Sequence, residues 1–334
     1  MSVMETSGKH TTSSKLEETL VSTFPRICQG CSQLTNKQIF LTDPAFEIKT
    51  LKQFVREGNE SYLFSKMALE ESYEGEMYLI LSLKQAITIS GLLLCFEDDV
   101  VRENAHKGEI DADGRDAFKE FANQVCGLLD NELRAKLPKP IHLKLLSTTL
   151  INGESAENEL GEELLNEESL ILTAKIRIIG FDDDLFMLSV SKIIGEEFFG
   201  EIIEDERKQF KGTLLAVDNS NADLRIIRKL LSSEYKIITT NNANDVLSAL
   251  QKTKIDLLLL NDTVGGVDGI SLCARIKRNA ICDEIPIVIC SSSPTQENVI
   301  RAVRAGARDF IVKPHTRQKL SEKIKKYMME KHTY

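Results

Sequence analysis

The C-terminal part of the chain alternates strictly between short apolar runs and amphipathic segments. We expect strands at Leu214–Val217, Lys236–Thr240, Asp256–Leu260, Pro286–Cys290 and Asp309–Val312, and helices near 222–232, 243–251, 269–279, 296–305 and 316–329. Strands that alternate with helices pair in parallel, because each helical crossover brings the chain back to the end of the sheet at which the previous strand began. The pattern therefore predicts an α/β fold with a five-stranded parallel sheet, whose functional pocket lies at the carboxyl ends of the strands.

The preceding residues show a different pattern, in which extended segments outnumber helices. Strands are expected at Gln38–Ile48, Ser61–Glu70, Glu76–Phe96, Ile141–Leu150, Leu170–Ile179 and Leu185–Ile194. Helices are expected at Lys15–Thr35, with an interruption near Pro25, at Asp116–Lys136 and at Glu196–Phe210. A charged loop, Glu97–Arg115, and an acidic insertion, Glu154–Glu168, connect these segments. Because few helices separate the strands, this part is predicted to be α+β with a largely antiparallel sheet.

The length of 334 residues exceeds the usual size of one domain. We place a first domain at 15–200, a helical linker at 201–212 and a second domain at 213–334, and we expect the Ser- and Thr-rich residues 1–14 to be disordered. Charge follows this division. Residues 213–334 contain 19 Lys and Arg against 13 Asp and Glu, a net charge of +6, whereas residues 1–212 contain 23 against 38, a net charge of −15. The acidic first part argues against binding of nucleic acid.

The composition, with 42% apolar and 28% charged residues, is ordinary for a soluble globular protein, and a cytoplasmic location is expected from the two features that follow. No apolar run is long enough to cross a bilayer, and the polar N-terminus lacks a signal-peptide pattern, so no membrane insertion is expected. The seven scattered cysteines are expected to be reduced. Cys28 and Cys31 form a lone CxxC, which two small residues on a helix explain better than a metal or redox site, and no metal site is predicted.

Polar residues stand at the carboxyl ends of the strands predicted in the C-terminal domain. They are Asp218 and Asn219 after the first strand, Asn261 after the third, Ser291 after the fourth and Lys313 after the fifth. Over residues 212–330 this constellation resembles the active site of response-regulator receiver domains, which have a flavodoxin-like fold. In that family two acids and an acceptor aspartate hold Mg²⁺, a Ser or Thr and a Lys contact the phosphoryl group, and an aromatic residue near the Lys changes rotamer.

The resemblance implies that Ser291, Lys313 and Phe310 keep the last three of these roles. Two other positions depart from the family, since Asn219 replaces one of the acids and Asn261 replaces the phosphoacceptor. An amide cannot act as a carboxylate nucleophile toward a phosphoryl donor. The C-terminal domain is therefore expected to be a pseudo-receiver that is not phosphorylated.

The remaining acids of this pocket are not expected to compensate. Mg²⁺ prefers carboxylate oxygen, so Asp218 alone is expected to bind it poorly. Asp262, next to the acceptor position, is a candidate replacement for the nucleophile. A shift of one residue along a strand turns the side chain to the other face of the sheet, which argues against this role. The spacing from Asn261 to Asp268-Gly269 also fits the family better than a frame that starts at Asp262.

The helix predicted at Asp116–Lys136 has two distinct faces. At 100° per residue Phe118, Phe121, Ala122, Val125 and Leu129 converge on one side, and Asp116, Glu120, Asn123 and Gly127 converge on the other. Any surface helix has a polar face, so periodicity alone favours a purely structural interpretation. The order Asp-x3-Glu-x2-Asn-x3-Gly, however, resembles the helix signature of the CheC/CheX/FliY family of chemotaxis phosphatases. Thr88–Leu94 resembles the strand before that helix, and the single Glu-x-x-Asn helix favours a CheX-like arrangement.

This second resemblance implies a phosphatase that hydrolyses the aspartyl phosphate of a separate, phosphorylated CheY-like response regulator. Asn123 would orient the attacking water and Glu120 would pair with the active-site Lys of the partner. Mg²⁺ would come with the partner receiver, so no intrinsic cofactor is expected, and the family suggests a homodimer. The alternative is a non-catalytic adaptor that binds receivers in a chemotaxis or phosphorelay pathway. A transcription factor is not expected, because the sequence has no helix-turn-helix segment.

Overall fold

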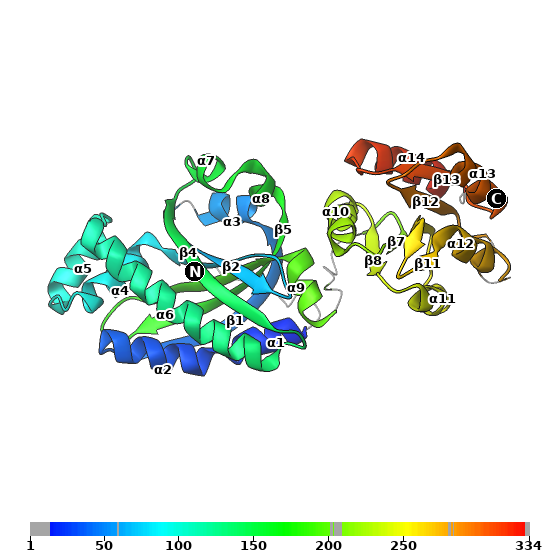
Figure 1. Cartoon of the computed structure of the whole chain (residues 1–334). Coiled ribbons are helices and arrows are strands. Elements are labelled where there is room, and N and C mark those ends of the chain that lie inside the picture. The colour runs from blue at the N-terminus through cyan, green and yellow to red at the C-terminus, as the bar shows by residue number, and fades with distance from the viewer. Residues whose placement is uncertain are drawn as a thin grey trace, which may run out of the picture. The chain divides into compact units, whose positions relative to one another are not determined.

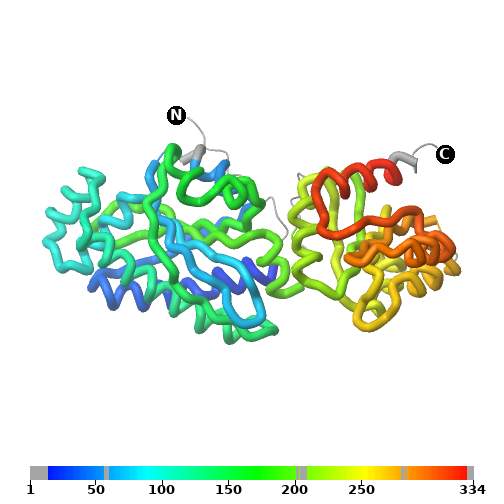
Figure 2. Tube along the Cα trace, turned by 45° about the horizontal axis from the view of Figure 1, so that its top comes forward, coloured from blue at the N-terminus to red at the C-terminus, as the bar shows by residue number. Residues whose placement is uncertain are grey.

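The computed structural model describes residues 14–330 apart from 59, 201–202, 204–208, 280–281 and 283. Contacts within the chain divide it into two compact units, residues 1–207 and residues 208–334. Figures 1 and 2 show a mixed sheet-and-helix architecture in both. Residues 1–13 of the segment expected to be disordered lie outside the described residues, whereas Ser14 caps the first helix by accepting a hydrogen bond from the amide of Glu17.

The N-terminal unit is built on a six-stranded antiparallel sheet with the strand order β1-β5-β6-β3-β2-β4. The strands are β1 (Ile39–Thr50), β2 (Tyr62–Glu71), β3 (Gly75–Ser82), β4 (Ile141–Ile151), β5 (Glu168–Ile178) and β6 (Asp184–Ser191). The expectation of an α+β unit with an antiparallel sheet is confirmed. The expected strand bounds agree to within a few residues, except that Glu76–Phe96 is a strand only as far as Ser82.

Helices cover both faces of this sheet (Figure 1). The larger core lies under α1 (Lys15–Val21), α2 (Phe24–Thr35) and α6 (Ala112–Lys136), where Ile27, Phe121 and Met67 belong to one cluster of buried apolar side chains. A smaller core lies under α3 (Leu51–Gly58), α7 (Ala156–Leu160) and α8 (Glu162–Asn166) on the other face. The break between α1 and α2 confirms the expected interruption, since Pro25 occupies the first turn of α2, where its missing amide hydrogen is not needed.

Three expected features of the N-terminal unit were wrong, and the first two concern segments that are helical. Residues Thr88–Leu94 are not a strand, because Leu83–Leu93 forms helix α4, capped by a hydrogen bond from the amide of Gln85 to Ser82. This helix is buried on most sides, so it lacks the polar stripe that reveals a helix in a sequence. The charged segment Glu97–Arg115 is not a loop either. It contains α5 (Asp98–Lys107), with acids in its first turn, and the start of α6.

The helix expected at Glu196–Phe210 was also placed incorrectly. Helix α9 spans Lys192–Phe199 and ends at Gly200, which adopts a left-handed conformation with φ of 66°. A glycine in this conformation is a common helix terminator, because it lacks the Cβ that makes the left-handed region unfavourable. Most of the expected linker at 201–212 lies outside the described residues.

The C-terminal unit has a five-stranded parallel sheet in the order β13-β12-β9-β7-β8. Its strands are β7 (Thr213–Val217), β8 (Lys236–Thr240), β9 (Leu257–Asn261), β12 (Ile287–Ser291) and β13 (Asp309–Val312). Helices α10 (Asn221–Leu231) and α14 (Arg317–Glu330) cover one face, and α11 (Ala243–Lys252), α12 (Gly269–Lys277) and α13 (Gln296–Arg304) cover the other. The α/β expectation is confirmed. A short hairpin of β10 (Thr263–Val264) and β11 (Val267–Asp268) follows β9.

Candidate functional site

Helix α6 has the two faces that its periodicity predicts. Phe118, Phe121 and Val125 are buried, whereas Glu120 and Asn123 are exposed. The rings of Phe118 and Phe121 stack with their centroids 6.0 Å apart. Glu120 and Asn123 are three residues apart in a regular helix, so their side chains are neighbours on its surface.

The position of α6 is fixed at both ends. Asp111 caps its N-terminus by accepting a hydrogen bond of 2.8 Å from the amide of Gly114. Near its C-terminal end, Asp130 accepts a hydrogen bond of 2.7 Å from the amide of Leu143 in β4. In contrast, Glu120 and Asn123 form no hydrogen bond or ion pair with any residue in the part of the chain that the structure describes. The carboxylate and the amide are therefore presented to solvent on a rigid support.

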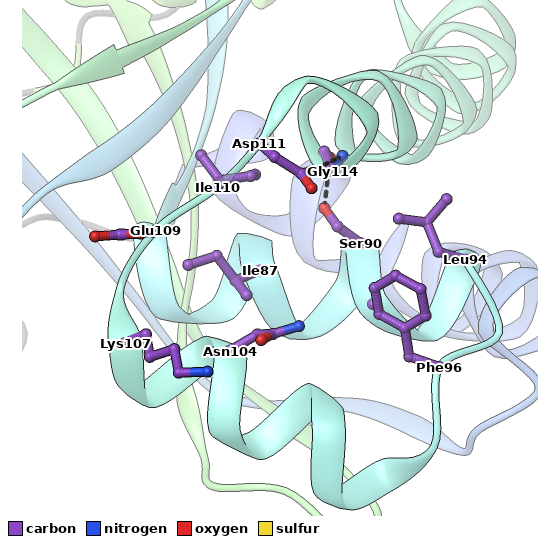
Figure 3. Close-up of a pocket in the computed structure, with 11 residues that line it drawn as sticks. Ile87, Ser90, Leu94, Phe96, Asn104, Lys107, Glu109, Ile110, Asp111 and Gly114 are labelled. Carbon is purple, nitrogen blue, oxygen red and sulfur yellow. Dashed lines mark hydrogen bonds between the residues drawn. The ribbon is translucent and has the colours of Figure 1, made fainter.

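A pocket of about 290 Å³ lies near the start of α6, but it is a different site (Figure 3). It is bounded by α4, α5 and the first turn of α6, and Ser90 closes one side by donating a hydrogen bond of 2.8 Å to the carbonyl of Gly114. Gly114 is buried in the face of α6 that packs against the unit, whereas Glu120 and Asn123 lie on the opposite face. The pocket therefore does not contribute to the Glu120–Asn123 face.

In the C-terminal unit, Lys313 is held between two carboxylates. Its Nζ donates hydrogen bonds to Oδ2 of Asp218, at 2.5 Å, and to Oδ2 of Asp223, at 2.7 Å. The side chain of Asp218 is only 2% exposed. Burial by itself would lower the pKa of Lys313, but the bonds to the two carboxylates outweigh burial and raise the pKa above its usual value. The ammonium group is therefore charged, and it pairs with both acids.

Asn261 and Asn219 lie together at the carboxyl ends of β9 and β7, as expected. The Nδ2 of Asn261 donates to Oδ1 of Asn219, at 3.0 Å, and to the carbonyl of Thr263, at 2.7 Å. Asn261 is buried, with 6% of its surface exposed. Phe310 is partly buried and packs against the core between the sheet and helices α11 to α13.

Asp262 lies closer to this pocket than strand periodicity suggests. The hydroxyl of Ser291 donates a hydrogen bond to Oδ2 of Asp262. The expectation that the Asp262 side chain turns away from the pocket residues was therefore wrong. Strand β9 ends at Asn261 and the hairpin begins at Thr263, so Asp262 lies in a connection to which the period of two does not apply. Asn261 nevertheless remains the residue at the end of the strand.

Sequence reasoning missed two other polar residues of this unit. Asp223 lies in the first turn of α10, where an acidic residue is common because it interacts favourably with the helix dipole. The sequence around Asp223 therefore does not indicate its hydrogen bond with Lys313. His315 is buried after Lys313 and Pro314, and both of its ring nitrogens lack a hydrogen-bond partner within the described residues. Burial, with a smaller contribution from the charge of Lys313, lowers the pKa of His315.

The described residues contain no group of three or more His, Cys, Asp and Glu side chains that could hold a metal ion. All seven cysteines are free thiols. Cys28 and Cys31 lie on α2, and burial raises the pKa of Cys31 to about 12, so this thiol is protonated at neutral pH. Among the helices described by the structure, none combines the length and the apolar character needed to span a membrane.

Comparisons with known proteins agree with the geometry of the C-terminal unit. Residues 214–325 match the family model of the response regulator receiver domain. The chain is 33% identical over 105 residues to the two-component response regulator ORR6 of Oryza sativa subsp. japonica, across 30% of this chain and 62% of that protein. It is 32% identical over 103 residues to the response regulator ORR3 of Oryza sativa subsp. indica, across 30% of this chain and 79% of that protein. The chain therefore belongs to the two-component response regulator family through its C-terminal unit.

Solved structures are similar to each unit. The crystal structure of FliY from Thermotoga maritima is similar over 56% of this chain and 95% of its own length, with 15% identity and a TM-score of 0.49. A putative response regulator from Chloroflexus aurantiacus is similar over 35% of this chain and 98% of its own length, with 24% identity and a TM-score of 0.34.

Proposed function

We propose that this signalling protein is cytoplasmic and is a CheX-like phosphatase, which hydrolyses the aspartyl phosphate of a separate CheY-like response regulator. The observation that carries the proposal is the exposed Glu120–Asn123 pair. The two side chains lie next to each other on α6, have no partner among the described residues, and are supported by a buried aromatic face. The order of polar residues along this face is the signature that resembles the phosphatase family.

The residue types suit the reaction. A phosphoryl group on a receiver is already activated by the metal and the Lys of that receiver, so hydrolysis chiefly needs a water molecule placed in line. The neutral amide of Asn123 orients this water without repelling the phosphoryl oxygens. The carboxylate of Glu120 forms a charge-assisted hydrogen bond with the partner's Lys and fixes its orientation. Mg²⁺ belongs to the partner, and the chain needs no cofactor of its own.

The C-terminal unit acts in this proposal as a regulatory or docking module that is not phosphorylated. Asn261 lacks the carboxylate nucleophile. The other polar groups of its pocket are already paired within the chain: Lys313 with Asp218 and Asp223, and Ser291 with Asp262. A pocket with these internal partners has little need of Mg²⁺ or of a phosphoryl group. The unit is thus a pseudo-receiver whose conformation does not depend on phosphorylation.

A second candidate function is that of a non-catalytic adaptor that binds receivers. The degenerate pocket at Asn219 and Asn261 favours it, because a chain that mimics a receiver constitutively needs no catalysis of its own. One assay separates the two functions. Purified chain is added to several receivers phosphorylated with acetyl phosphate and Mg²⁺, and the release of phosphate and the binding of each receiver are both measured. Accelerated release supports the phosphatase, whereas binding without acceleration supports the adaptor. The homodimer that this family suggests is checked in the same sample by light scattering.

A further inference from the structure

Gly127 lies on the exposed side of α6, one turn beyond Asn123. Apart from its chain neighbours and the adjacent backbone of α6, a Cβ atom built at this glycine would meet no atom of the described chain within 4 Å. Gly127 is also not among the glycines with a positive φ, so its backbone conformation is one that alanine adopts readily. Glycine in the interior of a helix is less stable than alanine, because it loses more conformational freedom on folding. The folding of the chain therefore gives no reason for a glycine at this position.

Other helical glycines of the same unit differ from Gly127 in this respect. A Cβ at Gly30 in α2 would lie 2.8 Å from Leu128, and one at Gly91 in α4 would lie 2.9 Å from Val101. A Cβ at Gly195 in α9 would lie 2.5 Å from Leu170. These three glycines allow two elements of the unit to pack closely, which is the usual reason for glycine in a helix. By the same reasoning, Gly127 leaves room for something outside this unit.

The position of Gly127 relative to Glu120 and Asn123 indicates which molecule occupies the space beside Gly127. Seven residues, or about two turns, separate Glu120 from Gly127, so the two lie about 20° apart around the helix and about 10 Å apart along it. Asn123 lies between them on the same face. An asparagine side chain is short, and its amide reaches an atom of a partner only when the partner's surface lies close to the helix. A side chain at position 127 would project from the same face of α6 and would hold the partner's surface away from the amide of Asn123.

We propose that Gly127 is the point at which the main chain of the partner receiver comes closest to α6. The proposal rests on the proposed function and extends it. Glu120 contacts the partner through its charge and Asn123 acts on the water, whereas Gly127 sets the distance between the two proteins. Gly127 is thus a positioning residue, and a side chain added there weakens the binding of the receiver without touching the reacting atoms.

The test compares the full chain with Gly127→Ala, Gly127→Leu and Ala135→Leu. Ala135 is exposed on the same helix, about two turns further on and about 80° around it, so Ala135→Leu is a control for an added leucine away from the proposed contact. Gly127→Ala is expected to raise the melting temperature by about 2–4 °C, because alanine is the better helix former. It is nevertheless expected to weaken receiver binding. Gly127→Leu is expected to weaken binding by about tenfold or more.

Two quantities are measured for each protein. The first is its affinity for single-domain receivers phosphorylated with acetyl phosphate, and the second is the rate of phosphate release at low and at saturating concentrations of the receiver. We expect Gly127→Leu to raise KM and to leave kcat nearly unchanged, whereas Ala135→Leu keeps both values. Wild-type affinity and KM in Gly127→Leu would overturn the inference and leave the phosphatase intact. A wild type that binds receivers without hydrolysis, together with weak binding by Gly127→Leu, would remove the phosphatase and support the inference. Failure of the wild type to bind any phosphorylated receiver overturns both.

Discussion

The side-chain amide of Asn261 donates a hydrogen bond of 3.0 Å to the carbonyl oxygen of the Asn219 side chain. Two carboxylates in these positions would repel each other and would need a cation between them. Two amides instead complement each other, one as donor and the other as acceptor. The two asparagines are therefore a matched pair, in which the amide of buried Asn261 has a partner within the chain.

This pairing predicts which substitutions restore a working receiver. The wild type and Asn219→Asp are expected to gain no phosphoryl group from acetyl phosphate and Mg²⁺, because both lack the nucleophile. The double variant Asn219→Asp with Asn261→Asp regains the nucleophile and the second acid, and is expected to be phosphorylated. Intact-mass measurement checks this by the gain of one HPO₃ group. A stable adduct on Asp262 or Asp218 of the wild type would contradict the proposal of a non-phosphorylatable unit.

Restoring the two acids is also expected to make the C-terminal unit depend on Mg²⁺. Without the ion, the double variant buries a carboxylate at position 261 beside a second carboxylate at position 219, and it is expected to unfold at a lower urea concentration than the wild type. Added Mg²⁺ binds the folded state and stabilises the variant according to its concentration and affinity. The wild type is expected to show no comparable response. Urea unfolding at several Mg²⁺ concentrations measures the stabilisation of each protein. An equal response of the two proteins would mean that the pairing of Asn219 with Asn261 does not make the wild type independent of Mg²⁺.

The roles of Asn123 and Glu120 predict different kinetic effects. Asn123→Ala is expected to abolish the accelerated release of phosphate and to leave receiver binding nearly unchanged, because the amide acts on the water. Glu120→Ala is expected to weaken both, because it also removes a charged contact with the partner. Both positions are exposed, so neither change is expected to alter stability by more than about 0.5 kcal/mol. Retention of wild-type hydrolysis by Asn123→Ala would rule out the proposed chemistry.

The buried face of α6 provides a contrasting prediction about stability. Phe121 is 1% exposed and stacks on Phe118 in the main core of the N-terminal unit. Phe121→Ala removes a large apolar side chain and leaves a cavity, so we expect a loss of about 3–5 kcal/mol in the free energy of unfolding. Denaturant unfolding measures this loss. A change of the size seen at exposed positions would mean that α6 does not pack as described.

His315 predicts that acid weakens the C-terminal unit. Its pKa is lowered in the folded state, chiefly by burial, so the unfolded chain binds the proton more readily than the folded chain does. Stability from the neutral imidazole is fully present above the unfolded pKa and is lost as pH falls toward the lowered folded pKa. His315→Phe keeps an apolar ring and removes this dependence. Urea unfolding at pH 7 and pH 5 is expected to show that the wild type loses more stability at the lower pH than His315→Phe does. Equal losses of stability in the two proteins would exclude His315 as the cause.

Features that depend on local periodicity can be predicted from the amino-acid sequence. Strands and helices that alternate from Leu214 onward predict a parallel sheet, and because the carboxyl ends of parallel strands lie at one end of the sheet, they also predict that Asn219, Asn261 and Lys313 lie at that end. The structure shows a hydrogen bond between Asn261 and Asn219, and another between Lys313 and Asp218. The exposed position of Glu120 and Asn123 follows equally from the 100° period of a helix.

The pairing of polar side chains, in contrast, is known only from the folded chain. Lys313 pairs with Asp223, which lies ninety residues earlier in the sequence. Ser291 pairs with Asp262, which lies in the connection after β9, where side chains do not follow the alternation of a strand. Similarly, Leu83–Leu93 is a helix whose sequence resembles a strand, because the rest of the unit encloses it on most sides and it therefore has no polar stripe. Such outcomes depend on which neighbours pack around a residue, and packing is a property of the folded chain that no local pattern contains.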